Sequence, residues 1–260
     1  MPNNYTLGRG KVYFARFLPG TFTPDGYFYI GNTPEFSLTI ESETLDHYSS
    51  DEGIREKDDS VPLEVNRTGS MTTDNIDPKN VALFFFGTDA PVTQAVVAAA
   101  PFVINDIHVG HSYKLGQTSI NPAGHFGINA TGLTVVRTAG SLALNLNTDY
   151  IIDLEGGIIT FVEGSAVAIE LADITVTYAL RASTRTRVLS GSAPVEGAMV
   201  YRTRNPKGDD VVFSMPYVKI TPNGDYALKG DEWQSIPLSL EILKPPVGEA
   251  IYRDGMPAYA

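Results

Sequence analysis

The chain has 260 residues, a formal net charge of −11 and no cysteine. The lack of cysteine excludes disulfide bridges and thiolate metal sites, and the acidic balance argues against a basic nucleic-acid-binding surface. With 43% hydrophobic and 19% charged residues, the composition is that of one large folded domain or two ordinary ones, without extensive disorder.

The N-terminal segment and the apolar runs give no sign of export or of a membrane span. The first residues, MPNNYTLGRGK, lack the apolar core of a signal peptide. The longest apolar runs, at 81–86 and 95–104, are much shorter than the roughly 20 residues that a membrane helix needs. We therefore expect a soluble, non-exported chain.

The N-terminal third predicts strands on either side of a charged segment. Short strands are expected at 11–17 and 27–30. In the next strand Phe36, Leu38 and Ile40 alternate with polar residues, the pattern of a half-buried strand. A further alternating strand is expected at 61–66, and Pro62 indicates that it starts at a sheet edge.

The segment 49–60 between these strands is predicted to be a long charged loop. Residues 41–60 carry a net charge of −6, because only Arg55 and Lys57 oppose eight carboxylates: Glu41, Glu43, Asp46, Asp51, Glu52, Glu56, Asp58 and Asp59. A hairpin connection needs only a few residues, so we expect this loop to contact something outside its own fold. The residues assigned to that contact are Ser49, Ser50, Asp51, Glu52, Gly53, Ile54, Arg55, Glu56, Lys57, Asp58 and Asp59.

One helix is predicted at 79–86. Asp77 is a natural N-cap, Pro78 suits the first helical position, and Gly87 stands just past the expected end. The helix has no polar face in its C-terminal half, so it should be buried on more than one side, by this chain or by a second copy. The side chains expected to be buried are Val81, Leu83, Phe84, Phe85 and Phe86.

The middle of the chain predicts an inserted β-sandwich (Ig-like) domain at 88–189. Its first part, 88–100, is compatible with a short helix or a loop. Short strands separated by turns follow, and Gly156-Gly157 is expected to form a two-residue hairpin turn. The six predicted strands are 133–137, 142–146, 150–154, 158–161, 167–171 and 174–180.

The C-terminal part returns to longer strands, expected at 196–203, 210–220 and 233–243. Together, 1–87 and 190–260 have the size of a single discontinuous domain. The fold class expected is mainly β.

The sequence contains no pattern that indicates an enzyme. The common nucleophile, phosphate-loop and metal motifs are missing. His108 and His111 would point to opposite faces of a strand, so we interpret them, with His125, as exposed histidines and not as metal ligands. A solvated charged loop does not supply the cleft that a pair of catalytic carboxylates needs. We expect no catalytic residue, metal or cofactor.

Three stretches, in this order and spacing, carry a family resemblance: LGRGKVYFA, GNTPEFSLTIESETLDHYSSDEGIREKD and VKITPNGDYALKGDEWQSIPLSLEIL. They resemble the major tail (tail tube) proteins of long-tailed, siphovirus-like bacteriophages. In that family a Gly-Asn pair precedes the strand and Ser-Ser-x-x-Gly loop that here are Gly31-Asn32 and 49–53. The matching C-terminal motif of the core domain is Gly230, Asp231, Glu232, Trp233 and Gln234.

The resemblance implies a tail-tube β-sandwich or barrel with one flanking α-helix, synthesised in the bacterial cytoplasm and located in the virion tail. Hexameric rings would stack into a tube that conducts genomic DNA during ejection, with transient contact and no specific binding. Tape measure, tail terminator and distal tail proteins would be partners, and no membrane would be involved. The long loop at 49–59 would reach an adjacent subunit or ring. The candidate residues for an acidic lumen are Glu41, Glu43, Asp46 and Glu64.

An alternative from another class stays open. The chain could be a non-enzymatic β-sandwich module that binds a receptor or a carbohydrate, with 88–189 as its active part. Imaging distinguishes the two hypotheses, because only the first predicts rings or hollow tubes.

Overall fold

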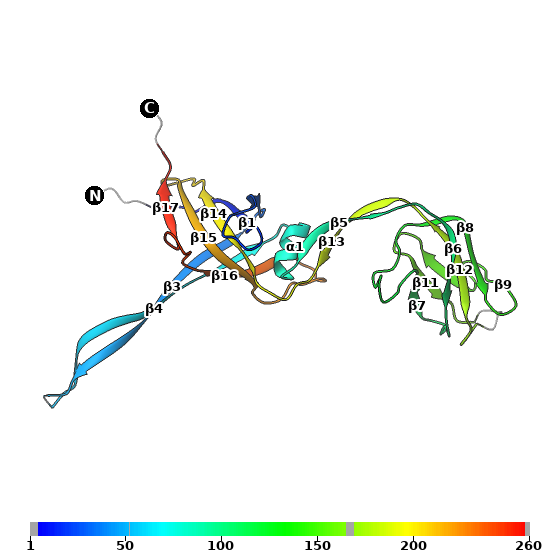
Figure 1. Cartoon of the computed structure of the whole chain (residues 1–260), viewed down its shortest axis with the longest axis horizontal. Helices are drawn as coiled ribbons and strands as arrows, with labels where there is room; N and C mark the ends of the chain where they lie inside the picture. The colour runs from blue at the N-terminus through cyan, green and yellow to red at the C-terminus, as the bar shows by residue number, and fades with distance from the viewer. Residues whose placement is uncertain (1–4, 52, 165–168, 258–260) are drawn as a thin grey trace. The chain divides into compact units, whose positions relative to one another are not determined.

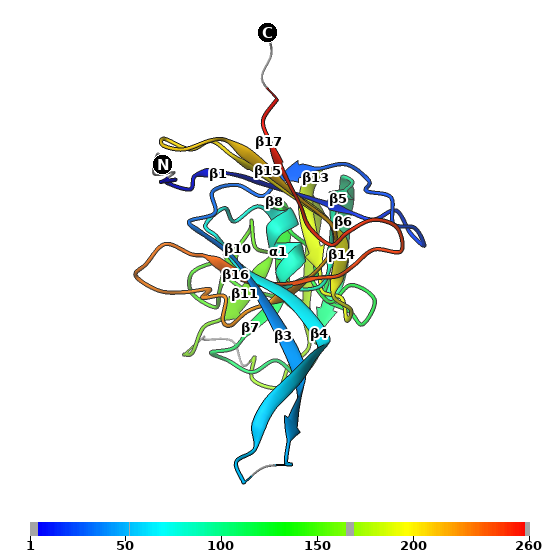
Figure 2. The same ribbon diagram turned by 90° about the vertical axis from the view of Figure 1, so that its left-hand side faces the viewer.

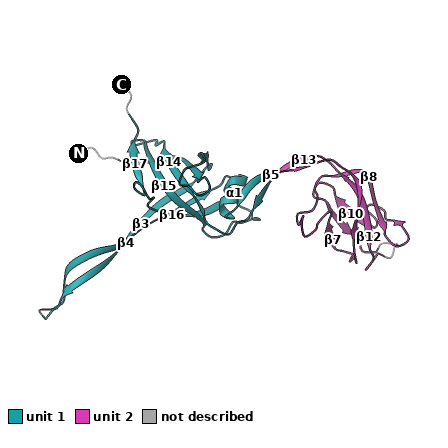
Figure 3. Ribbon diagram, viewed as in Figure 1, with its two compact units in different colours: residues 1–90, 187–260 teal, residues 91–186 magenta. Residues whose placement is uncertain are grey.

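The computed structural model describes residues 5–51, 53–164 and 169–257. It is mainly β, with 53% of residues in strands and 3% in one helix, which confirms the expected class. The chain divides into two compact units (Figure 3). Unit 1 comprises Met1–Ala90 and Arg187–Ala260, and unit 2 comprises Pro91–Thr186. The boundaries expected from the sequence were 88 and 189.

Unit 1 is built on one antiparallel sheet with the order β2-β1-β14-β15-β16-β4-β3, and β17 also pairs with β15. Strands β14, β15 and β16 from the C-terminal part of the chain lie between β1 and β4 from the N-terminal part, so neither part forms the sheet alone. Its strands are β1 (Gly10–Arg16), β2 (Phe28–Tyr29), β3 (Glu35–Ser49), β4 (Glu56–Thr73), β14 (Val195–Thr203), β15 (Val211–Pro222), β16 (Ile236–Ile242) and β17 (Tyr252–Gly255).

The helix α1 (Pro78–Phe84) packs on β15 and β16, and its Leu83 belongs to the core of unit 1. The predicted start is confirmed: the Asp77 side chain accepts a hydrogen bond from the Lys79 N–H at 2.9 Å, and Pro78 follows it. The predicted end is wrong by two residues. The Gly87 N–H donates to the Ala82 carbonyl at 2.7 Å while Phe86 takes a φ of 53°, a C-terminal motif that closes the helix.

The early end of α1 changes the predicted burial. Leu83 is fully buried, Val81, Phe84 and Phe86 are half-buried, and Phe85 is 40% exposed. The prediction that Phe85 is buried is therefore wrong for a single copy of the chain. Phe85 is the C-cap residue, where the chain turns away from the core.

Two glycines allow the two connections between the units to approach each other closely. A Cβ on Gly87 would lie 1.7 Å from the Leu189 carbonyl oxygen, and one on Gly191 would lie 2.0 Å from that of Phe86. Just beyond, β5 (Thr88–Gln94) pairs with β13 (Ser183–Leu189). The expectation of a helix or loop at 88–100 is wrong, because pairing with a distant segment makes this stretch strand.

Unit 2 contains a sheet with the order β6-β12-β8-β9 and another with the order β10-β11-β7. Val176 from the first sheet and Phe161 from the second belong to one hydrophobic core. The strands are β6 (Val97–Ile104), β7 (Ser112–Lys114), β8 (Ile128–Arg137), β9 (Leu142–Ala143), β10 (Tyr150–Asp153), β11 (Ile158–Phe161) and β12 (Ile174–Leu180).

Two local predictions in unit 2 need correction. The β10–β11 hairpin is confirmed, but four residues connect its strands, because Asp153 pairs with Ile158. The Asp153 carboxylate accepts the N–H groups of Glu155 and Gly156, which favours this longer turn. The strand expected at 167–171 falls partly outside the described residues. Residues 169–171 are not a strand, and Leu171 has a φ of 55°.

Candidate assembly surface

The longest pairing in unit 1 joins β3 and β4 from Glu35–Thr72 to Ser49–Glu56. Figures 1 and 2 show this hairpin extending away from the rest of the unit. The predicted loop at 49–60 is therefore wrong in extent, because residues 50–55 alone connect the strands. Glu56 to Ser60 belong to β4, and Glu52 lies outside the described residues.

We call residues 40–67 of the hairpin the arm, and no third strand pairs with it within the described residues. β16 pairs with β4 only from Thr68 to Thr73. Ten residues of β3 within the arm span about 33 Å. Large apolar side chains on the arm are exposed, with Ile40 at 62% and Leu45 at 63%. Val61, Leu63 and Val65 are exposed as well. The arm is thus an apolar and acidic ribbon that no layer covers in the described part of the chain.

Pro62 lies inside β4 and not at its start as predicted. It stands opposite Thr44, beside a register shift, where β3 is the one neighbour of β4 among the strands that the structure describes. A proline lacks the N–H that a second neighbouring strand would need, so it fits this place in the sheet. The sheet edge that Pro62 predicts is therefore not confined to the start of β4 but extends along the whole arm.

Three of the four predicted lumen residues share one face of the arm. Glu43 stands directly opposite Glu64, and Glu41 is two residues from Glu43 on the same face. Like charges directly opposite each other destabilise a sheet, and within the described residues no cation lies within ion-pair distance of these carboxylates. Asp46 lies on the other face by strand alternation, where Lys57 Nζ is 2.6 Å from its Oδ1.

Other charges of the arm are paired within it. The hydrogen bonds from Lys57 and from the Ser60 hydroxyl lower the pKa of Asp46 below its usual value. His47 Nδ1 lies 2.6 Å from Asp58 Oδ1, and this hydrogen bond lowers the pKa of Asp58. These contacts hold the two strands together far from the core.

The sheet of unit 1 is open at both ends. Among the described residues, no strand pairs with the outer edge of β3. At the other end, β2 pairs with β1 at Tyr13 and Phe14, and the N–H groups of Ile30 and Asp25 donate to the carbonyls of Val12 and Arg16. The open edge at this end is therefore that of the two-residue strand β2. Open edges carry unpaired backbone N–H and C=O groups that can pair with another chain.

The C-terminal motif 230–234 lies in the loop between β15 and β16. Trp233, the one tryptophan of the chain, is 97% exposed, and β16 starts only at Ile236. The expected strand start at Trp233 is wrong. The side-chain amide of Gln234 donates to the Leu228 carbonyl at 3.1 Å, which holds this part of the chain as a loop.

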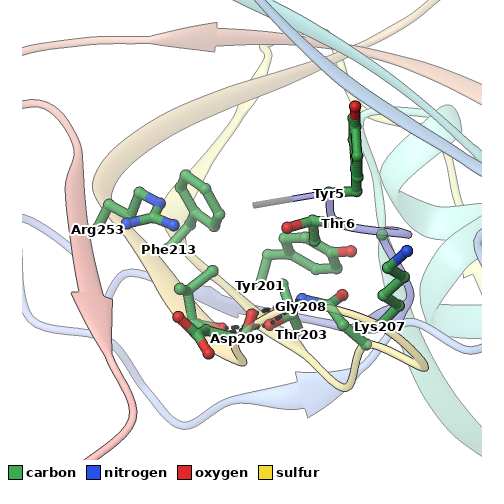
Figure 4. A pocket seen from close by; sticks show the side chains of 12 residues that line it. Tyr5, Thr6, Tyr201, Thr203, Lys207, Gly208, Asp209, Phe213 and Arg253 are labelled. Carbon is green, nitrogen blue, oxygen red and sulfur yellow. Dashed lines mark hydrogen bonds between the residues drawn. The ribbon is translucent and has the colours of Figure 1, made fainter. Parts of the chain in front are cut away.

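A cavity of about 590 Å³ lies between the N-terminal segment and strands β14 and β15 (Figure 4). The Lys207 ammonium is 5.4 Å from the Tyr5 ring centre, and the Arg253 guanidinium is 5.8 Å from the Phe213 ring centre. Asp209 is the one carboxylate among the lining residues, and no histidine lines the cavity.

The expectation of exposed histidines is confirmed for His108 and His111 and wrong for His125, which is half-buried with its Nδ1 3.0 Å from the Tyr178 hydroxyl. His108 and His111 lie in a turn with ring centres 5.4 Å apart, and His108 Nδ1 lies 2.7 Å from Glu170 Oε1. The described part of the chain holds no group of three or more side chains arranged to bind a metal ion. None of its helices has the length and apolarity required to cross a membrane.

Two comparisons with known proteins bear on identity. One family model, described as "Protein of unknown function UCP028589", matches residues 5–249. A comparison with curated proteins finds no match.

Proposed function

The chain belongs to this family of unknown function, and we propose that it is the structural subunit of a phage tail tube. In this proposal hexameric rings stack into a hollow tube that conducts genomic DNA during ejection. Unit 1 is the tube-forming domain with a tail-tube fold. Unit 2 is an Ig-like domain carried on the outside of the tube.

The observation that carries the proposal is the uncovered arm. Ile40 and Val61 are more than half exposed in one chain, although they belong to the alternating apolar runs 36–40 and 61–65. An apolar two-stranded ribbon is marginally stable in water. Contact with neighbouring copies would bury these side chains and cover the ribbon.

The open sheet edges support the same proposal. The outer edge of β3 and that of the short strand β2 lack a partner strand among the described residues. These edges belong to different strands, so a contact between one edge of one copy and the other edge of a second copy is heterologous. Heterologous contacts between identical chains generate rings or filaments instead of closed dimers.

The acidic face of the arm fits a channel for DNA. Glu41, Glu43 and Glu64 share one face without a paired cation among the described residues. In the proposal these carboxylates line the lumen, where they repel the phosphate backbone and let DNA slide. Asp46 is left out of this lining, because it lies on the other face and pairs with Lys57.

Negative-stain imaging and light scattering of the concentrated protein test the proposal. We expect rings, and hollow tubes at higher concentration. A chain that stays monomeric at all concentrations and binds a glycan array would contradict the proposal and favour the receptor- or carbohydrate-binding module.

A further inference from the structure

A groove lined by basic side chains lies on the surface of unit 1, although the chain as a whole is acidic. It has a volume of about 480 Å³ and is formed where β1 runs beside β14. Four exposed cations line it together with a single carboxylate, Asp210: they are Arg9, Lys11, Arg202 and Arg204. So many cations at one place are unexpected in a chain with a net charge of −11.

The groove cations are held close together by the sheet. Lys11 and Arg202 are directly opposite each other in the β1–β14 ladder, and the Arg204 N–H donates to the Arg9 carbonyl at 2.7 Å. Within the described residues, no carboxylate lies within ion-pair distance of any of the four side chains. Like charges gathered in this way repel each other, and an anionic partner would relieve the repulsion.

The distal part of the arm has the complementary charge. Asp46 and Asp58 are paired within the arm, while Asp51, Glu56 and Asp59 have no cation within ion-pair distance among the described residues. Arg55 is the one cation there that is not in an ion pair among the described residues, and it stacks on Tyr48. The three carboxylates outnumber it, and this negative excess matches the excess of cations in the groove.

The arm cannot bring these carboxylates to the groove of its own chain. Arg9 and Gly10 line a cavity together with Pro34 and Phe36, so the groove lies beside the base of the hairpin. The end of the arm lies about 33 Å further along the strands. A contact between the two surfaces therefore has to join two copies.

We propose that the distal arm of one copy, residues 46–51 and 53–60, docks into the groove of a second copy. The proposal rests on the proposed function and specifies which surfaces join successive rings. Because groove and arm end are different surfaces at opposite ends of one hairpin, the contact is head-to-tail and repeats without closing. Its partner is a second copy of this chain, recognised by charge.

Cross-linking tests the contact directly, since the chain has no native cysteine. The variant Glu56→Cys/Arg204→Cys, treated with a short bis-maleimide, should give a ladder of linked copies on a denaturing gel. The matched control Glu56→Cys/Lys229→Cys keeps the arm thiol and moves the second thiol to an exposed lysine outside the groove. A ladder in the control as strong as in the test variant, or no ladder in either, would overturn the proposal.

Charge reversal separates this proposal from the proposed function. Arg202→Glu/Arg204→Glu should form rings but lose tubes, while Lys229→Glu should form tubes as the unchanged chain does. Adding Glu56→Lys/Asp59→Lys to the groove variant should restore tubes. Circular dichroism checks that every variant is folded.

The possible outcomes are distinct. If the unchanged chain and the groove variant both form tubes, the arm–groove contact is wrong and the tube function stands. If the unchanged chain forms neither rings nor tubes, the proposed function fails. A groove variant that assembles normally but no longer retards a DNA fragment in a gel would assign the groove to nucleic acid and overturn the proposal.

Discussion

The two halves of the β3–β4 hairpin have the same ladder and different surroundings. At the base, Met71 is 1% exposed opposite Phe36 and packs in the core of unit 1. In the arm, Ile40 is 62% exposed opposite Arg67. Both halves alternate apolar and polar residues. The alternation predicts a strand, but it does not say whether the covering layer comes from the same chain.

The buried residues at the base stabilise the fold of one chain, while the exposed residues of the arm are available for contacts with another chain. Base residues should affect stability in a monomer, and arm residues should affect assembly. The following variants test that division.

Removal of the end of the arm should have the largest effect. Deletion of Asp51–Asp58 takes away the exposed connection and leaves the core residues of unit 1 in place. We expect a folded chain that forms no tubes, measured by negative-stain imaging and circular dichroism. As a control, replacement of residues 91–186 by a short linker should still permit tubes, only thinner ones. Tubes of normal length after the arm deletion would show that the arm is dispensable.

Truncation of one side chain in each half compares them directly. Met71→Ala should lower the free energy of unfolding of unit 1 by about 2–5 kcal/mol, because it leaves a cavity. Ile40→Ala should change it by less than about 0.5 kcal/mol, because its side chain is already in solvent. Urea denaturation followed by circular dichroism measures both, with hydrogen exchange in β16 assigning the transition. An equal loss of unfolding free energy in the two variants would contradict the distinction between base and arm residues.

Glycines in the two halves provide a smaller contrast. A Cβ on Gly69 would lie 2.7 Å from the Ser37 carbonyl oxygen, so Gly69→Ala should cost about 1–3 kcal/mol. A Cβ on Gly53 would meet nothing within 4 Å, so Gly53→Ala should change stability by at most about 1 kcal/mol, in the stabilising direction. Thermal unfolding measures both, and a destabilised Gly53→Ala variant would show that the connection is packed.

Acid should loosen the arm before the base, with the smallest effect of the four. The pKa values of Asp46 and Asp58 are lowered in the folded chain from 3.8 by hydrogen bonds from Lys57 and His47 respectively. Their contribution is therefore present above pH 3.8 and is lost as the pH falls through the lowered values. NMR cross-strand contacts in the arm should weaken there, and Asp46→Asn/Asp58→Asn should remove this pH dependence. Cross-strand contacts that weaken at the same pH in the base and in the arm would contradict this prediction.

Much of unit 1 could be predicted from local sequence, because local chemistry determines those features. Asp77 and Pro78 start α1 through backbone groups within one turn. Conversely, the length of the arm depends on ladder pairs such as His47–Asp59 and Ser49–Glu56 between polar residues, which carry no hydrophobic pattern. Polar composition therefore indicated a loop where the structure has strands.

Features that depend on distant residues could not be predicted in the same way. Thr88–Gln94 becomes strand through pairing with β13, about a hundred residues later in the chain. The groove cations are adjacent only because β1 pairs with β14. The signal that could have found the groove is the repeated basic character of Arg9, Lys11, Arg202 and Arg204 at the two ends of an acidic chain.

The alternation of the two chain ends in the sheet of unit 1 has a consequence for synthesis. β1 needs β14 as its neighbour and β4 needs β16, but about 120 residues separate the end of β4 from the start of β14. At typical rates of translation this delay is on the order of ten seconds, during which unit 2 emerges completely. Unit 2 can therefore fold on the ribosome while β1 and β4 wait for their partners. Unit 1 is the last of the two units to close, because its sheet stays incomplete until β16 has been made.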